Sequence, residues 1–175
     1  MNPFNRYTPA DAPAATQTVL AQTVKQLGFL PDALAAMAES PELVEAFSAA
    51  STAFHHTTFS PLERELIALT FGVALDCHVC IAFHVRLLSR LGPQHVAPLK
   101  NGKPLADGHL QVLRATAAHV LEQKGRLDEA QLQAFFAAGF TRRQALELAL
   151  AAGTFTLSAF SNRMTGAIVD PGLQS

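Results

Sequence analysis

The residues best suited to chemistry lie in one short stretch, residues 77–84, with the sequence CHVCIAFH. On a helix, which repeats every 3.6 residues, Cys77, Cys80 and His84 fall on one face. The same geometry places the Cα atoms of the two cysteines about 5 Å apart, within the range that a disulfide bond spans. The spacing therefore predicts a cysteine pair that can be oxidised and reduced without unfolding the helix.

The position of this pair at a helix start favours a reactive sulfur. Asp76 is predicted to cap the helix, which would place both sulfurs within about its first turn. Unpaired N–H groups and the helix dipole there favour thiolate, the form of cysteine that acts as a nucleophile. His84 lies one turn beyond Cys80 and two turns beyond Cys77, so its imidazole can reach the sulfur of Cys80 but not easily that of Cys77. This combination predicts redox chemistry.

Glu65 is a carboxylate in unusual surroundings. If its segment is helical, its neighbours three and four positions away are Leu62, Ala68 and Leu69. A carboxylate facing apolar side chains can exchange a proton near neutral pH. Glu65 is therefore a candidate proton carrier for His84 or a sulfur.

The elements that must position these residues are predicted to be helices throughout. Caps such as Ser40-Pro41 and the capping boxes of Ser60 with Glu63 and Thr141 with Gln144 begin helices, and several glycines end them. No segment shows the alternation of a strand. The sequence predicts an all-α single-domain fold of about seven or eight helices, with residues 1–13 as an N-terminal extended segment and residues 14–175 as the helical domain. The expected helices cover residues 14–27, 31–38, 41–54, 61–75, 77–91, 107–124, 128–138 and 141–166.

Composition excludes several classes of function. Apolar residues make up 49% and charged residues 15% of the chain, which argues against disorder. Thirteen Lys and Arg against 14 Asp and Glu leave a net charge of -1, so no nucleic-acid partner is expected. No signal peptide or membrane span is evident, which predicts a cytoplasmic protein without a membrane partner. The apolar helices that begin at Pro61 and Thr141 predict a homo-oligomer.

One family resemblance is carried by specific residues. Glu65, Cys77 twelve positions later, Cys80 and then His84 together resemble the active-site motif of the alkylhydroperoxidase D-like branch of the carboxymuconolactone decarboxylase family. Residues 62–69 and 90–92 are also similar to that family, and the resemblance extends from about residue 28 onward. It implies an AhpD-like all-helical fold, assembled as trimers or hexamers. The implied activity is a thiol-dependent peroxidase or disulfide oxidoreductase, without haem, flavin or metal, acting on organic hydroperoxides.

The resemblance also implies a role for each residue of the motif. Cys80 would be the peroxidatic sulfur and Cys77 its disulfide partner, while Glu65 and His84 would form a proton relay. An external dithiol, either a donor protein or a lipoyl-type reductant, would restore the pair. Val79 stands where related proteins often carry a histidine or an aromatic residue, so this relay would have one member fewer.

Other interpretations remain open from the sequence alone. The chain could be a decarboxylase-like lyase acting on a lactone, or a non-enzymatic redox-sensing oligomer. A zinc site is a further alternative, in which the two cysteines and His84 would need a fourth ligand. Candidates for that ligand are Glu65, His55 and His56. His55, His56 and Phe83 are also possible lining residues of a substrate pocket. Asn162 and Arg163 are interpreted as a possible interface pair.

Overall fold

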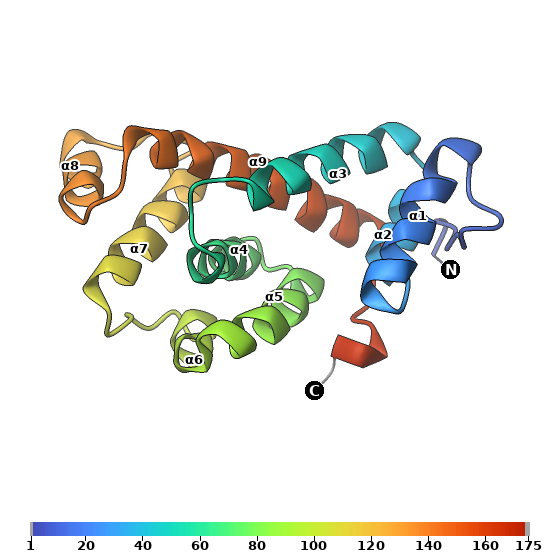
Figure 1. Cartoon of the computed structure of the whole chain (residues 1–175), viewed down its shortest axis with the longest axis horizontal. Helices are drawn as coiled ribbons and strands as arrows, with labels where there is room; N and C mark the ends of the chain where they lie inside the picture. Colours follow the sequence, from blue (N-terminus) through green and yellow to red (C-terminus); the bar gives the residue numbers. More distant parts are fainter. Residues whose placement is uncertain (1, 174–175) are drawn as a thin grey trace.

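A computed structural model describes residues 2–173 of the chain, and these residues form nine α-helices and no strand (Figure 1). The predicted all-α class is confirmed, and each of the eight predicted helices is present. The additional helix, α6, has only five residues, one of them a proline, and no side-chain hydrogen bond caps its start. The helices are α1 (Ala14–Leu27), α2 (Asp32–Met37), α3 (Pro41–His55), α4 (Pro61–Ala74), α5 (His78–Leu91), α6 (Val96–Lys100), α7 (Gly108–Glu122), α8 (Glu129–Ala137) and α9 (Arg142–Thr165). Two 3₁₀ turns cover Pro93–His95 and Pro171–Leu173.

Local capping explains where the helices that carry the site begin. At α4 the backbone N–H of Ser60 donates to Glu63 at 2.7 Å, and the N–H of Glu63 donates to the Ser60 hydroxyl at 3.3 Å. Thr141 and Gln144 form the same reciprocal pair at the start of α9. Each box satisfies donors that a helix end otherwise leaves unpaired. The two predicted capping boxes are therefore confirmed.

Helix α4 lies in the middle of the molecule and supplies much of its core (Figure 1). It packs against α5, α6, α7 and α9. Its apolar residues from Leu66 to Leu69, together with Phe71, are fully buried, as expected for a helix that is apolar nearly all round. Phe71 stacks on Phe155 of α9, with ring centroids 5.9 Å apart. The central position of α4 brings its one buried carboxylate, Glu65, into the interior.

Residues 2–13 run in turns and bends along the surface of α2. The Arg6 guanidinium contacts Asp32 of α2 at 2.7 Å and also donates to the carbonyl of Thr165 at 3.0 Å. The backbone N–H of Tyr7 donates to the carbonyl of Ala35. These contacts tie the start of the chain to α2 and to the end of α9.

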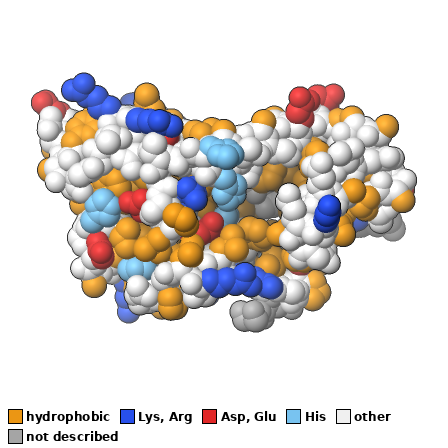
Figure 2. Space-filling model, in the orientation of Figure 1, with side chains coloured by type: hydrophobic (Ala, Val, Ile, Leu, Met, Phe, Trp, Pro, Cys, Tyr) orange, Lys and Arg blue, Asp and Glu red, His pale blue; other side chains and the backbone are white. Residues whose placement is uncertain are grey.

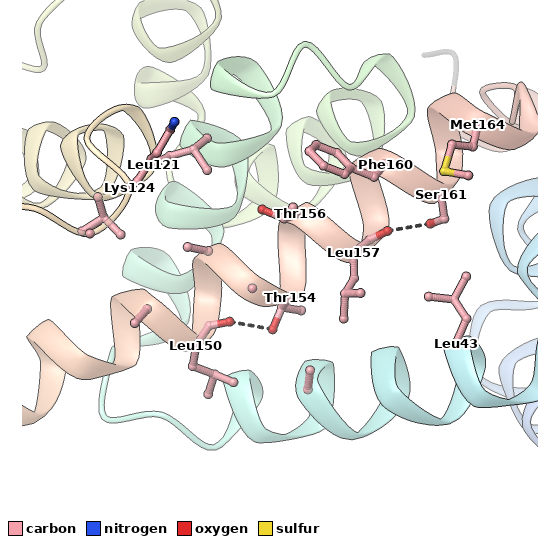
Figure 3. A pocket seen from close by; sticks show the side chains of 16 residues that line it. Leu43, Leu121, Lys124, Leu150, Thr154, Thr156, Leu157, Phe160, Ser161 and Met164 are labelled. Carbon is pink, nitrogen blue, oxygen red and sulfur yellow. Dashed lines mark hydrogen bonds between the residues drawn. The ribbon is translucent and has the colours of Figure 1, made fainter.

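The surface carries little concentrated charge and one apolar row. Lysine and arginine side chains are scattered over the face shown in Figure 2. On the outer side of α9, Leu146 and Met164 are 76% and 73% exposed, and Leu157 lies between them. Leu157 and Met164 line an apolar groove together with Leu43 of α3 and Leu121 of α7 (Figure 3). Within residues 2–173, no helix combines the length and the apolarity that crossing a bilayer requires.

Candidate active site

The two cysteines lie at the start of α5 and are joined by a disulfide bond. Their Cα atoms are 5.2 Å apart, close to the separation that the helical spacing predicts. Cys77 is itself the N-cap of α5, and its sulfur accepts a hydrogen bond from the backbone N–H of Cys80 at 3.2 Å. The helix start therefore directs a backbone N–H group at the sulfur of Cys77, and it places Cys80 within the first turn, where the helix dipole favours a thiolate once the bond is reduced.

The predicted cap at Asp76 is wrong by one residue. Asp76 has a φ of 50°, in the left-handed region, and the extended cap position is taken by Cys77. Arg163 of α9 donates to the carbonyls of Leu75 at 2.5 Å and Asp76 at 3.1 Å, which holds this turn in place. The left-handed backbone of Asp76 thus occurs together with a contact from a distant helix, and the capping preference of aspartate by itself does not predict it.

Helices α4 and α5 are in contact beside the cysteines, at Gly72. A Cβ at Gly72 would lie in ordinary van der Waals contact with the Cβ of Cys80 at 3.4 Å and the backbone nitrogen of Ile81 at 3.5 Å. The carbonyl of Gly72 also accepts a hydrogen bond from the N–H of Cys77 at 2.9 Å. With the two helices side by side here, residues one and two turns away can meet across them.

Glu65 of α4 and His84 of α5 form such a pair. The carboxylate Oε2 of Glu65 lies 2.8 Å from Nδ1 of His84, and their side chains are only 10% and 15% exposed. The His84 ring packs edge-on against Phe155, with centroids 5.3 Å apart. A carboxylate on Nδ1 favours the tautomer with its proton there, so Nε2 is left as the basic nitrogen.

The sulfurs have two polar neighbours on α9 that sequence reasoning did not assign to the site. The Cys80 sulfur lies 3.7 Å from the Ser158 hydroxyl and 3.6 Å from Nδ2 of Asn162. Asn162 is buried within its own chain at 3% exposure, whereas Arg163 is exposed, so the interpretation of the two residues as an interface pair stays a prediction for Arg163 alone. Their separation of about 80 residues from the motif explains why local spacing gave no signal.

A cavity of about 460 Å³ brings the candidate residues together. Cys80, Glu65 and His84 all line it, whereas Cys77 does not. Phe83 and His55 also line the cavity, and apolar side chains make up much of the remaining wall. No lysine or arginine is among the residues lining this cavity, which the described part of the chain forms.

The two adjacent histidines have different positions. His55, at the end of α3, lines the cavity, and burial lowers the pKa of its imidazole, an effect that the negative charge of Glu65 partly offsets. Both histidines are exposed at the surface, but His56, unlike His55, does not line the cavity.

Val79 contributes an apolar surface to the site rather than a proton-transfer group. It is buried in a small cluster with Cys77, Cys80, Ala159 and Ala167. The neighbouring histidine, His78, turns away and pairs with the carbonyl of Ala167 at 3.1 Å. The histidine that faces the cavity from α5 is therefore His84.

The residues that the zinc alternative required are arranged differently from a metal site. The two sulfurs are bonded to each other, and His84 is paired with Glu65. Within residues 2–173, no three or more histidine, cysteine, aspartate and glutamate side chains gather in a group that could hold a metal ion.

Comparisons with known proteins agree with this fold and motif. Residues 38–93 match the model of the carboxymuconolactone decarboxylase family, and a comparison with curated proteins gives no match. The chain is similar to a structure described as an alkylhydroperoxidase AhpD core, an uncharacterized peroxidase-related protein from Ralstonia eutropha JMP134. The identity is 21% over 99% of this chain and 96% of that chain, with a TM-score of 0.86.

Two further structures are similar at the level of fold. A peroxidase-related protein from Silicibacter sp. TM1040 is 24% identical over 94% of this chain and 90% of that chain, with a TM-score of 0.81. The debrominase Bmp8, as a variant in complex with 2,3,4-tribromopyrrole, is 16% identical over 99% and 95% of the two chains, with a TM-score of 0.81.

These findings define the class of protein as an all-helical, AhpD-like fold. The segment that matches the carboxymuconolactone decarboxylase family model, residues 38–93, includes both cysteines, Glu65 and His84. The resemblance inferred from the sequence is thereby confirmed.

Proposed function

We propose that the protein is a thiol-dependent peroxidase and disulfide oxidoreductase that reduces organic hydroperoxides. One observation carries this proposal. A single cavity contains one sulfur of a disulfide pair, Cys80, together with the hydrogen-bonded pair of Glu65 and His84. A nucleophile and a base that open onto the same cavity, with the base oriented by a third group, can act on one substrate, which is what the proposed catalysis requires.

In the proposed reaction the Cys80 thiolate attacks the outer oxygen of the hydroperoxide, and the O–O bond breaks. The alkoxide leaves as an alcohol after it takes a proton from His84, and Cys80 becomes a sulfenic acid. The Cys77 thiol then attacks this sulfur and water leaves, so the two cysteines end as a disulfide. An external dithiol reduces the disulfide and is itself oxidised, which completes the cycle.

The position of Cys80 supports its assignment as the attacking sulfur. Both cysteines are buried, but Cys80 lines the cavity and Cys77 does not. Glu65, on Nδ1 of His84, would hold the imidazole with Nε2 free to exchange a proton, and would stabilise the imidazolium that forms. These two residues are therefore proposed as the proton relay, with no cofactor besides the cysteine pair.

The residues that line the cavity support an uncharged, largely apolar substrate. Because no lysine or arginine is among the lining residues and much of the wall is apolar, the cavity suits an uncharged organic hydroperoxide better than an anion. The external reductant is proposed to be a dithiol protein or a lipoyl-type group. We place the reaction in the cytoplasm, where thiols are kept reduced.

A second candidate is the reductive removal of bromine from an aromatic ring, because the debrominase Bmp8 shares the fold and Phe83 and Phe155 line this cavity. Here the Cys80 thiolate would attack bromine, and the carbon that loses it would take a proton. Cys77 would then displace bromide from the Cys80 sulfur, which again yields a disulfide. Both candidates use the same two cysteines, so the products separate them.

The decisive experiment compares the reduced protein with Cys80→Ser and Cys77→Ser variants. Wild type is expected to consume cumene hydroperoxide with dithiothreitol as donor, and its peptide containing both cysteines should lose two hydrogens. Cys80→Ser should be inactive, while Cys77→Ser should stop at a sulfenic acid that dimedone traps. Two free thiols after peroxide treatment would refute the proposal. Release of bromide from a bromopyrrole without peroxide consumption would select the second candidate.

We also propose that the protein assembles as a homo-oligomer, a trimer or hexamer, through the outer face of α9. Six residues on this face are spaced alternately by four and three positions, the pattern by which helices pack along a common seam. At Gly153 in the middle of the row, a Cβ would have open space around it, which allows a second copy to approach closely. The six residues are Leu146, Leu150, Gly153, Leu157, Phe160 and Met164.

A further inference from the structure

The side chain of Asn162 lies against both sulfur atoms of the disulfide. Its Nδ2 atom is 3.5 Å from the sulfur of Cys77 and 3.6 Å from the sulfur of Cys80. The same nitrogen is 3.4 Å from the Ser158 hydroxyl. Asn162 is only 3% exposed, so water contributes little to its environment. The donor side of this amide therefore faces the cysteine pair.

The acceptor side of the same amide is unsatisfied. The Oδ1 atom of Asn162 is buried and accepts no hydrogen bond from any residue between positions 2 and 173. A buried acceptor without a donor costs free energy, and such atoms are uncommon in native structures. The disulfide cannot remove this cost, because neither of its sulfurs carries a hydrogen. Reduction creates an S–H donor beside the amide.

We propose that Asn162 is a positioning residue that stabilises the reduced cysteine pair relative to the disulfide. In the reduced state its Nδ2–H group donates to the Cys80 thiolate, and its Oδ1 atom accepts from the Cys77 thiol. This inference rests on the proposed function, since it assigns Asn162 a role in the same thiol cycle. It adds control of the equilibrium between dithiol and disulfide.

The reduction that Asn162 favours can be written so that it balances. A donor with two thiols gives two electrons to the Cys77–Cys80 bond and leaves as its own disulfide. The S–S bond breaks, Cys77 keeps one of the donor's two protons as a thiol, and the other proton goes to solvent. Cys80 is left as a thiolate.

Hydrogen bonding gives the direction of the effect. A thiolate is a much stronger acceptor than a disulfide sulfur, because hydrogen bonds to charged groups are roughly twice as strong as neutral ones. Breaking the S–S bond also lets the sulfurs separate to van der Waals contact, so that one can face each side of the amide. Both changes favour the reduced state, so Asn162 makes the pair a stronger oxidant of its donor.

The test is the dithiol–disulfide equilibrium of Asn162→Leu, which removes both polar atoms at similar size. The intact protein is equilibrated with mixtures of reduced and oxidised dithiothreitol, and alkylated thiols are counted by mass spectrometry. The pH is fixed, because four side chains with acid or base groups line the same cavity, namely His55, Glu65, His84 and Asp170. The variant should favour the disulfide by roughly tenfold or more, which corresponds to a potential about 30 mV lower.

Thr165→Val is the matched control. Thr165 is a buried polar residue one turn further along α9, and its hydroxyl donates to the carbonyl of Ser161 at 2.7 Å rather than to a sulfur. Its equilibrium constant should stay within twofold of wild type. If Asn162→Leu does not fold, Asn162→Ala gives the same measurement without extra bulk.

The outcomes separate this inference from the proposed function. An Asn162 variant with the wild-type equilibrium, or one shifted toward the dithiol, overturns the role of Asn162 alone. A wild-type protein whose cysteines do not exchange with dithiothreitol at all overturns the thiol cycle and the inference with it. Because no peroxide is present, a lack of peroxidase activity does not affect the measurement.

Discussion

Replacing His84 with glutamine tests the proton relay most directly. A free thiol at its reference pKa of about 8.5 is only about 3% ionised at pH 7. If His84 holds the thiol proton, wild-type Cys80 is largely thiolate, and the variant loses about 30-fold in reactive sulfur. The variant also lacks the acid that protonates the leaving alkoxide. Together these losses should slow the reaction with peroxide by roughly 10²–10⁴-fold at pH 7, the usual range for a positioned acid–base group.

The assay is the single-turnover reaction of the reduced protein with cumene hydroperoxide, measured as a function of pH. The deficit of His84→Gln should shrink as the pH rises past the pKa of the thiol, because hydroxide then removes the proton. Glu65→Gln should show the same trend with a smaller loss, since Glu65 acts through Nδ1 of His84. His56→Gln is the matched control, because it removes an exposed histidine that lies outside the cavity.

The pH profile also identifies the result that would refute this reasoning. A His84→Gln protein that reacts at the wild-type rate at pH 7 would show that His84 is not the base. A loss that is equal at every pH would point to a displaced Cys80 rather than to a missing proton carrier. In the first case, the apolar Val79 beside Cys80 would point to a reaction other than peroxide reduction.

Two further predictions concern assembly and stability. Leu157→Glu on the outer face of α9 should convert the expected trimer or hexamer to smaller species in light scattering. Leu91→Glu is the control, because it changes an exposed leucine on α5, and it should leave the assembly intact. A wild-type monomer at micromolar concentration would contradict this assembly. Burial alone would raise the pKa of Glu63, but hydrogen bonds from His109 and Ser60 outweigh burial and lower this pKa below 4.5. The hydrogen bond to Glu63 in turn raises the pKa of His109 above 6.5. The stabilisation from Glu63 is thus lost as pH falls through its folded pKa, and that from His109 is lost as pH rises through its own. His109→Ala should therefore lower the unfolding free energy by about 0.5–1 kcal/mol at a pH between the folded-state pKa values of Glu63 and His109, and by less near pH 8.5. Urea titrations at several pH values measure this loss. A loss that does not depend on pH would argue against the ion pair.

Most of the helical framework could be predicted from the sequence because helix ends are specified locally. The capping boxes that begin at Ser60 and Thr141, and the glycines that end several helices, act within a few residues of chain. The separation of Cys77 and Cys80 follows from helix geometry in the same way. Helix α6 was missed because it is five residues long and has no side-chain cap.

The pairing of Glu65 with His84 required more than local rules. The sequence indicated a helix for each residue, but their contact depends on how α4 crosses α5. That crossing is a tertiary feature, since α4 and α5 pack along each other through side chains from both helices. Helix periodicity shows which face of each helix is apolar, but it does not show which residues of the two faces lie opposite each other.

The position of Asn162 beside the sulfurs could not be predicted from the sequence. Asn162 lies more than 80 residues beyond the cysteines, and a polar residue near the end of a long helix normally faces solvent or a neighbouring subunit. It reaches the sulfurs only because α9 packs against α5, and because Arg163, the next residue, holds the turn before Cys77 through two carbonyls. The adjacent pair thus secures the cysteine segment at two points, one on its backbone and one on its sulfurs. Since Arg163 acts on carbonyls that do not change with oxidation, Arg163→Gln should loosen the turn in both redox states, whereas the effect of Asn162 should depend on the redox state.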